Sequence, residues 1–338
     1  MNRIEVFPGL TPAAYQRHCL HGDEAVWPEK NCSGDLWIEL LNALGCEPRA
    51  LLPFTLAVDF EGDQWTFFKP PADELRDLYG VDVQELTIYR PLIEHAVEHL
   101  GAGKLIAAET DAFWLPDTAG TDYRTGHKKT TIAMANLDVE ARTLGYFHNA
   151  GYFELSGDDF AKVFRLDVPE DPAWLPFYAE VVRIDRLVKR TPEELAAKSL
   201  KNLRRHFDWR PQTNPFKRFG ARLVQDAPLQ KEQGLARYHL WAFASIRQAG
   251  AAFELAAANL RWLAGLGHDD LAEAAQQFES IAQANKALIL KGARAANAGR
   301  ALDAEGLIAE MAQAWEQGME RIGQVLGYDV LPSVAAKP

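Results

Sequence analysis

The stretch NCSGDLWIELLNALG, residues 31–45, places a cysteine directly before an amphipathic segment. Apolar residues recur there at the spacing of one helix face, namely Leu36, Trp37, Leu40, Leu41 and Leu44. The N-terminus of a helix carries a partial positive charge, which lowers the pKa of a nearby thiol. The stretch therefore predicts a helix with one buried face and Cys32 at its start. The thiol is either a nucleophile or a small apolar group that fills space where a loop meets the helix.

The overall composition is that of an ordinary globular protein and excludes several functional classes. The chain has 338 residues, 48% hydrophobic and 25% charged, a length that suggests about two domains. Its net charge of −11 argues against nucleic acid as the main partner. Three cysteines are too few for a disulfide framework and favour a reducing compartment. Since no signal segment or membrane-length apolar run is visible, we expect a cytoplasmic protein without a membrane partner.

The first half of the chain mixes short apolar runs with proline- and glycine-rich turns. The expected strands are residues 51–60, 63–69, 104–116, 129–137 and 143–155. Helices are expected at residues 71–80 and 89–103, the second stopped by its glycines. This order predicts an α+β domain with a mainly antiparallel sheet over residues 1–185.

The second half is nearly all helical in pattern. The stretch TPEELAAKSLKNLRRHF, residues 191–207, begins with Thr191, Pro192 and Glu194, which together make a capping box with proline in the first helical turn. Three long alanine-rich stretches follow, at residues 228–266, 269–297 and 303–327. We expect a helical bundle of about four helices over residues 190–330.

Residues that could assist a cysteine nucleophile follow in the first half of the chain. Such a nucleophile needs a base within hydrogen-bond reach and a group that orients the base. His127 lies at the start of one expected strand, and Asn149 lies on the returning strand, where its amide oxygen could hold the imidazole. His148 and Asp138 are alternatives for this third position. The order of Cys32, His127 and Asn149 is that of papain-like enzymes.

A cysteine nucleophile that attacks a carbonyl group also needs N–H donors that stabilise the resulting oxyanion. The candidates are the backbone N–H of Cys32, the side chain of Asn31, and Gln64 if its segment folds back over the helix start. No metal is expected, because HCLH at residues 18–21 lacks the paired spacing of zinc ligands and DFEGDQ at 59–64 lacks the glycine and closing glutamate of a calcium loop.

Three motifs together resemble known proteins: NCSGDLWIELLNALG, TDAFWLPDTAGTDYRTGHKKTTI and LGYFHNAGYFELSGDDF. They are similar to an uncharacterised bacterial family found near amino acid:carrier-protein ligases. More distantly, they resemble the N-terminal domain of butirosin-type acyltransferases and the bacteriocin-processing cysteine peptidases. The resemblance covers about residues 18–165 and implies a papain-like thiol fold that moves acyl groups from a carrier-protein thioester to an amine. It also implies roles for four residues: Cys32 as nucleophile, His127 as base, Asp111 as the acidic residue in the strand before the base, and Asn149 as the orienting residue.

One segment is basic in this acidic chain. Residues 183–222 contain 12 Lys or Arg against 4 Asp or Glu, a net charge of +8. The segment is either a solvated helix face or a dock for an acidic carrier protein or for phosphopantetheine phosphate. The contacts of such a dock would be Arg204, Arg205, Lys217 and Arg218.

These features predict a cytosolic acyltransferase of secondary metabolism that works through an acyl-Cys32 intermediate. Its partners would be an acyl or aminoacyl carrier protein and a small-molecule amine or hydroxyl acceptor, and it would need no cofactor of its own. Two alternatives stay open. A cysteine peptidase or amidohydrolase would use the same residues with water, and a non-catalytic carrier-binding module would keep the fold with an idle thiol.

Overall fold

The chain forms two compact units in the computed structural model, which describes residues 3–168 and 175–328. Unit 1 comprises Met1–Gly22, Cys32–Pro48 and Pro71–Lys189, and unit 2 comprises Asp23–Asn31, Arg49–Pro70 and Arg190–Pro338. The second unit therefore includes two segments from the first part of the sequence as well as everything after residue 189. They belong there because their aromatic side chains pack against helices, as when Trp65 meets Phe216 at 4.9 Å between ring centroids.

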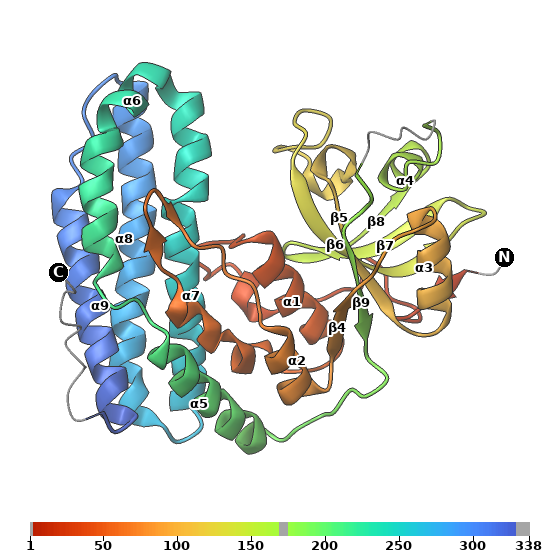
Figure 1. Cartoon of the computed structure of the whole chain (residues 1–338), viewed down its shortest axis with the longest axis horizontal. Helices are drawn as coiled ribbons and strands as arrows, with labels where there is room; N and C mark the ends of the chain where they lie inside the picture. The colour runs from red at the N-terminus through yellow and green to blue at the C-terminus, as the bar shows by residue number, and fades with distance from the viewer. Residues whose placement is uncertain (1–2, 169–174, 329–338) are drawn as a thin grey trace. The chain divides into compact units, whose positions relative to one another are not determined.

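Unit 1 is built on an antiparallel sheet with the strand order β4-β9-β5-β6-β7-β8, and β1 pairs with β6 outside this path (Figure 1). The strands are β1 (Ile4–Glu5), β4 (Asp82–Glu85), β5 (Leu105–Asp111), β6 (Lys129–Asp138), β7 (Thr143–His148), β8 (Gly151–Ser156) and β9 (Ala179–Arg183). Every pairing in the sheet is antiparallel. The predicted α+β class with an antiparallel sheet is confirmed.

The helices of unit 1 pack on this sheet. They are α1 (Cys32–Ala43), α2 (Ala72–Tyr79), α3 (Leu92–Gly101) and α4 (Asp158–Val163), with 3-10 turns at Cys19–His21, Ala112–Trp114 and Pro116–Thr118. The helix predicted from residues 31–45 is confirmed, and Leu36, Leu40 and Leu41 are buried on it as expected. The helices predicted at 71–80 and 89–103 are also confirmed. Burial of these leucines is the main force that holds α1 in place, at about 25 cal/mol per Å² of apolar surface.

One predicted strand is wrong, a second is much shorter than predicted, and a third is two strands. Residues 51–60 lie mostly in a 3-10 helix, Pro48–Ala57, and residues 63–69 supply only β3 (Gln64–Trp65), which pairs with β2 (Phe60–Glu61). A short apolar run that is buried on all sides has no period that separates strand from helix, so the first prediction failed. The stretch 143–155 is the hairpin of β7 and β8, which turns at Asn149 and Ala150.

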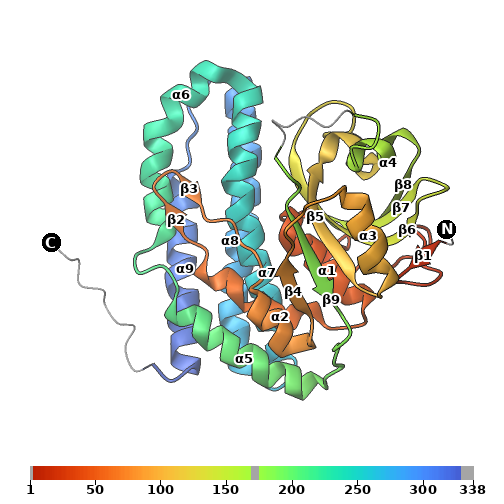
Figure 2. The same cartoon turned by 45° about the vertical axis from the view of Figure 1, so that its right-hand side comes forward.

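Unit 2 is a bundle of long helices; Figure 2 shows α6 to α9 running side by side and α5 lying across their lower end. They are α5 (Pro192–Asp208), α6 (Pro215–Ala244), α7 (Ile246–Ala264), α8 (Ala272–Asn297) and α9 (Glu305–Val325). The capping box predicted at Thr191 is confirmed, since its hydroxyl accepts from the Glu194 N–H while the Glu194 carboxylate accepts from the Thr191 N–H. The stretch 228–266 is not one helix, because Gly234 has a non-helical backbone (φ +74°) that kinks α6, and Ser245 separates α6 from α7.

The core of the bundle depends on glycines that admit aromatic rings. A Cβ on Gly250 would lie 2.6 Å from the Trp27 indole, and one on Gly318 would lie 2.5 Å from the Phe278 ring. Side chains at these two positions would therefore push the aromatic rings out of place. Among the described residues, no helix combines the length and apolarity needed to span a bilayer.

Candidate functional site

Cys32 is the first residue of α1 and is half-buried. Burial raises the pKa of the Cys32 thiol, and the nearby Asp35 carboxylate adds to this effect. The charge of Lys129, together with the Thr130 hydroxyl and the Thr131 backbone N–H as donors to the thiolate form, acts in the opposite direction and is weaker. The thiol is therefore protonated at neutral pH, so it needs a base before it can act as a nucleophile.

Thr130, which acts on the pKa of the Cys32 thiol, is bonded to a buried His–Asp pair. The Thr130 hydroxyl oxygen lies 2.7 Å from Nε2 of His148, and Nδ1 of His148 lies 2.5 Å from Oδ2 of Asp117. The Tyr146 hydroxyl donates to the other Asp117 oxygen at 2.5 Å. The side chains of His148 and Asp117 are 1% and 3% exposed. We call the set of Cys32, Thr130, His148 and Asp117 the relay: hydrogen bonds join Thr130 to His148 and His148 to Asp117, and Thr130 is one of the groups that lower the pKa of the Cys32 thiol.

The sheet and one turn bring the relay together. Since β6 and β7 are antiparallel with Ala133 opposite Phe147, the last residue of β7 reaches the beginning of β6, where Thr130 lies. Tyr146 and His148 are two residues apart on β7, so both side chains project from the same face of the sheet and meet Asp117. Asp117 lies in the turn Pro116–Thr118, which the Thr118 hydroxyl pins by donating to the carbonyls of Ala112 and Leu115.

The second candidate base, His127, forms a pair with Asp111. Its Nδ1 lies 2.6 Å from Oδ2 of Asp111, and its ring stacks on Phe113 with centroids 4.3 Å apart. The other Asp111 oxygen accepts from the backbone N–H groups of Phe113 and Lys128. The His127 side chain is 69% exposed, and His127 is not among the described residues that act on the Cys32 thiol. The structure thus joins Asp111 to His127, and it gives Thr130, not His127, an effect on the Cys32 thiol.

Asn149 and Asp138, two of the residues predicted to orient the catalytic base, lie at turns. Asn149 is in the two-residue turn between β7 and β8 with φ of +42°, a left-handed conformation that asparagine tolerates better than most residues. The Asp138 carboxylate, at the end of β6, accepts from the Ala141 backbone N–H at 2.9 Å and caps the following turn. Of the residues expected at this position, His148 is the one that the structure places in the relay.

The candidate oxyanion donors differ in their surroundings. The Cys32 backbone N–H is in the first turn of α1, where N–H groups have no partner within the helix. The Asn31 side chain belongs to unit 2, is buried and donates to the Phe68 carbonyl at 3.0 Å. Gln64 also belongs to unit 2 and is exposed on β3.

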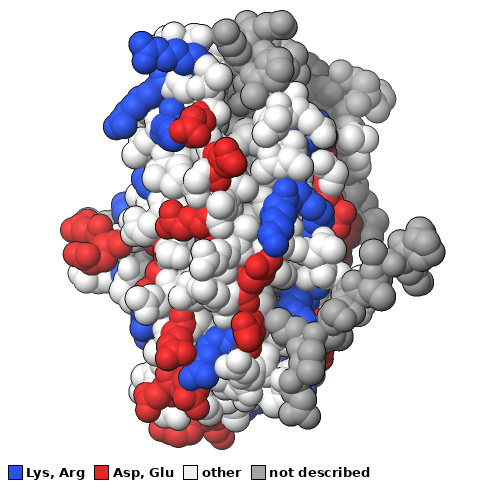
Figure 3. Space-filling model, turned by 90° about the vertical axis from the view of Figure 1, so that its left-hand side faces the viewer, with Lys and Arg blue, Asp and Glu red and all other residues white. Residues whose placement is uncertain are grey.

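The basic residues of the predicted carrier dock make contacts within unit 2. Arg204 donates to the Leu326 carbonyl at 2.6 Å, and Lys217 forms an ion pair with Glu316 at 2.6 Å. Arg218 bonds to the Asp59 carboxylate and the Phe60 carbonyl, and Arg205 is exposed and also has polar contacts. On the face shown in Figure 3, acidic and basic side chains alternate instead of forming one basic area. These contacts support the helical unit itself.

No metal centre is apparent in the part of the chain that the structure describes. Within residues 3–168 and 175–328, no three His, Cys, Asp or Glu side chains are grouped so that they could hold an ion. All three cysteines are free thiols.

Comparison with protein families gives two matches that cover most of the chain. The DUF1839 N-terminal domain matches residues 16–184, and the DUF1839 C-terminal domain matches residues 192–324. A search of curated proteins finds no match.

Proposed function

The chain belongs to the DUF1839 family through both of its domains, and we propose that it is a cysteine-dependent acyltransferase in which Cys32 carries the acyl group. The observation that supports this proposal most strongly is the relay. A half-buried thiol at a helix N-terminus is influenced by a hydroxyl that bonds to a buried imidazole, and a carboxylate holds that imidazole. This is the nucleophile, base and orienting group of covalent catalysis, with Thr130 inserted between the first two.

The proton moves along the relay in one concerted shift. In the resting state the Cys32 thiol donates to the Thr130 oxygen, the Thr130 hydroxyl donates to Nε2 of His148, and Nδ1–H of His148 donates to Asp117. Activation moves one proton from sulfur to the Thr130 oxygen and one from that oxygen to Nε2. The result is a Cys32 thiolate and a His148 imidazolium. Asp117, which also accepts from Tyr146, stabilises the imidazolium without taking its proton.

The thiolate then attacks the carbonyl carbon of an acyl thioester. The carbonyl oxygen becomes an oxyanion, which the Cys32 backbone N–H at the positive end of α1 is positioned to stabilise. The carbon–sulfur bond to the donor breaks, and the departing thiol takes the proton back from His148 through Thr130. An acyl-Cys32 thioester remains. An acceptor amine or hydroxyl attacks it, loses its proton to a base, and releases Cys32.

Two features support the finer parts of this proposal. A cysteine-headed helix packed against an antiparallel sheet, with the imidazole on a later strand, is the arrangement of papain-like enzymes. The pair of His127 and Asp111 is exposed, so a bound acceptor could reach it. In this proposal His127 takes up the proton that the acceptor loses when it attacks the acyl-Cys32 thioester. The donor in this proposal is an acyl or aminoacyl carrier protein, and the acceptor is a small molecule.

The test is intact-mass analysis after mixing the full-length protein with a carrier protein loaded with an aminoacyl thioester. Wild type should gain the mass of the acyl group, Cys32→Ala should not, and the matched control Cys46→Ala should behave like wild type. Cys46 is a fair control because it is also half-buried and burial also raises the pKa of its thiol. An adduct that persists in Cys32→Ala, or cleavage of amides without any thioester donor, would overturn the proposal.

A further inference from the structure

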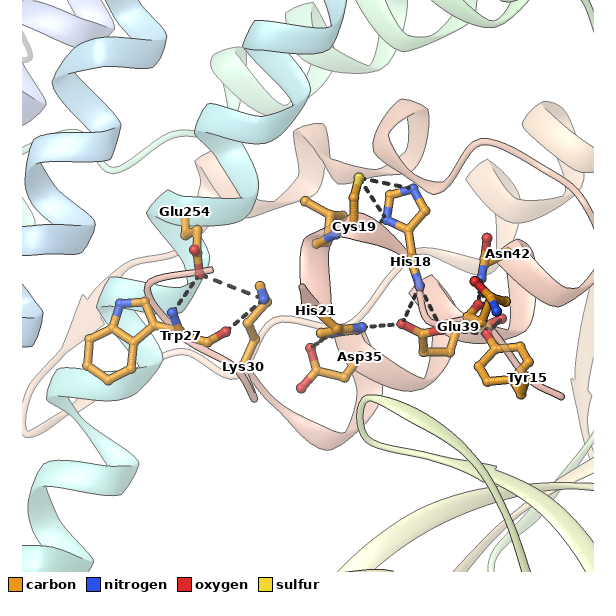
Figure 4. A network of polar contacts seen from close by, with 12 residues as sticks. Tyr15, His18, Cys19, His21, Trp27, Lys30, Asp35, Glu39, Asn42 and Glu254 are labelled. Atoms are coloured by element: carbon orange, nitrogen blue, oxygen red, sulfur yellow. Dashed lines mark hydrogen bonds and ion pairs between the residues drawn. The ribbon is translucent and has the colours of Figure 1, made fainter. Parts of the chain in front are cut away.

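Two carboxylates are fully buried on α1, directly after Cys32. They are Asp35 and Glu39, and both side chains are 0% exposed. His21, from the turn Cys19–His21, lies between them (Figure 4). Its Nε2 is 2.9 Å from Oδ1 of Asp35, and its Nδ1 contacts Oε1 of Glu39. Burial of two carboxylates is costly unless charged partners and hydrogen bonds compensate, and His21 supplies both.

The contacts determine where the proton of this cluster lies. A neutral imidazole has one N–H and one lone pair, but here both ring nitrogens face carboxylate oxygens. Glu39 accepts from the Tyr15 hydroxyl, and the His18 backbone N–H lies 3.2 Å from both Glu39 oxygens, so Glu39 acts as an ionised acceptor. Both carboxylates can be ionised only when the imidazole donates to each of them, and this requires the imidazole to hold the additional proton.

The Asp35 carboxylate of this cluster lies close to the Cys32 thiol. Asp35 is three residues after Cys32, so the two side chains share one face of the helix. Its negative charge is one cause of the raised thiol pKa. An imidazolium hydrogen-bonded to Asp35 offsets that charge.

We propose that His21 is a positioning residue for Cys32: as an imidazolium, it anchors the first turn of α1 between Asp35 and Glu39 and balances the negative charge beside the sulfur. The inference rests on the proposed role of Cys32, because it explains how that thiol is kept reactive. It does not depend on which acyl group is transferred.

Other ionisable groups around His21 and Cys32 also affect how the reactivity of the Cys32 thiol depends on pH. His21 is surrounded by Asp35 and Glu39, with Tyr15 beyond Glu39, and with His18, which lies 3.8 Å from Glu47. Cys32 is influenced by Lys129 and Asp35 and bonded by Thr130, which leads to His148. Apart from the residue substituted, these groups are the same in each variant that follows, so differences from wild type report on the changed residue.

The test measures alkylation of Cys32 by iodoacetamide at pH 7, with the labelled peptide quantified by mass spectrometry. His21→Gln leaves Asp35 unbalanced and should slow the reaction about threefold to tenfold, while Asp35→Asn removes the charge and should accelerate it by a similar factor. His99→Gln, on α3, is the matched control and should react like wild type. Changes of the same sign in both variants, or a wild-type rate in His21→Gln, would overturn the inference.

A second measurement needs no variant and covers the case in which His21→Gln does not fold. Nitrogen-15 NMR of the wild-type imidazole distinguishes one protonated ring nitrogen from two. Two protonated nitrogens on His21 at pH 7 are expected, and a neutral tautomer would overturn the inference. Neither measurement uses an acyl donor, so this inference and the proposed acyl transfer can fail independently.

Discussion

The Thr130 hydroxyl oxygen lies 2.7 Å from Nε2 of His148, and both side chains are buried on neighbouring antiparallel strands. A threonine in this place does two things. It satisfies a buried imidazole nitrogen that would otherwise lose a hydrogen bond, and it lowers the pKa of the Cys32 thiol. The pair therefore contributes both to the stability of unit 1 and to the chemistry proposed for Cys32.

Replacement of Thr130 separates these two contributions. Thr130→Val keeps the shape but removes the hydroxyl, so acylation of Cys32 should slow at least about 100-fold and the free energy of unfolding should fall by about 1–3 kcal/mol. Thr130→Ser keeps the hydroxyl and should retain most of the acylation rate. Single-turnover mass measurements and urea unfolding check these values. An unchanged acylation rate in Thr130→Val would rule out proton transfer through this residue.

Asp117 should control the orientation and the charge of His148. Asp117→Asn keeps the size of the side chain but removes its negative charge, so the His148 imidazolium loses its stabilising partner. We expect acylation to slow about 100-fold or more, because general base catalysis is worth about that much. The control Tyr146→Phe removes only one donor to Asp117 and should cost about 1–2 kcal/mol in unfolding free energy with a smaller effect on rate. Equal effects of the two substitutions on the rate would contradict this ranking.

The raised pKa of Cys32 predicts a characteristic pH dependence. Because burial is the largest cause, the rate of alkylation should reach half its maximum above pH 8.5, the ordinary value for a free thiol. For stability, a raised pKa in the folded state means that the protonated Cys32 thiol makes its full contribution to the free energy of unfolding at pH values below its pKa in the unfolded chain. This contribution is lost as the pH rises through the folded-state pKa. Urea unfolding from pH 7 to 10 should show this loss in wild type and less of it in Cys32→Ala. A labelling midpoint below pH 8 would contradict the burial argument.

His127 should act on the second half-reaction only. Its pair with Asp111 is exposed, so His127→Gln should change the free energy of unfolding by less than about 1 kcal/mol. We expect the acyl-Cys32 species to form at the wild-type rate and then persist longer in the presence of an amine acceptor. Time courses of adduct decay with and without acceptor test this. Decay at the wild-type rate would mean that another group accepts the proton of the acceptor.

The sequence was sufficient where local spacing determines the structure. The leucines of residues 31–45 predicted α1 and put Cys32 at its start, and Thr191 with Glu194 predicted the beginning of α5. It was insufficient for residues 51–60, where burial on all sides removes the periodicity that distinguishes strand from helix.

The residues of the relay were harder to predict because they meet through tertiary structure. Asp117 follows a proline in a turn, and its partner His148 is 31 residues further on. Threonine is common in strands, so nothing in the local sequence indicates that Thr130 belongs to the relay. One signal was available: Tyr146 and His148 are two residues apart on one strand, and two polar groups on a buried face need a common partner. The irregular register between Met134 and Asn136 in β6 also makes facing residues difficult to assign from sequence.

The most direct measurement compares the rates at which acyl-Cys32 forms in wild type, His148→Gln and His127→Gln, each mixed with the same loaded carrier protein and followed by intact mass. The relay predicts that His148→Gln loses at least about 100-fold while His127→Gln keeps the wild-type rate. Wild-type acylation in His148→Gln, or a loss confined to His127→Gln, would show that the Cys32 thiol is not activated through Thr130 and His148.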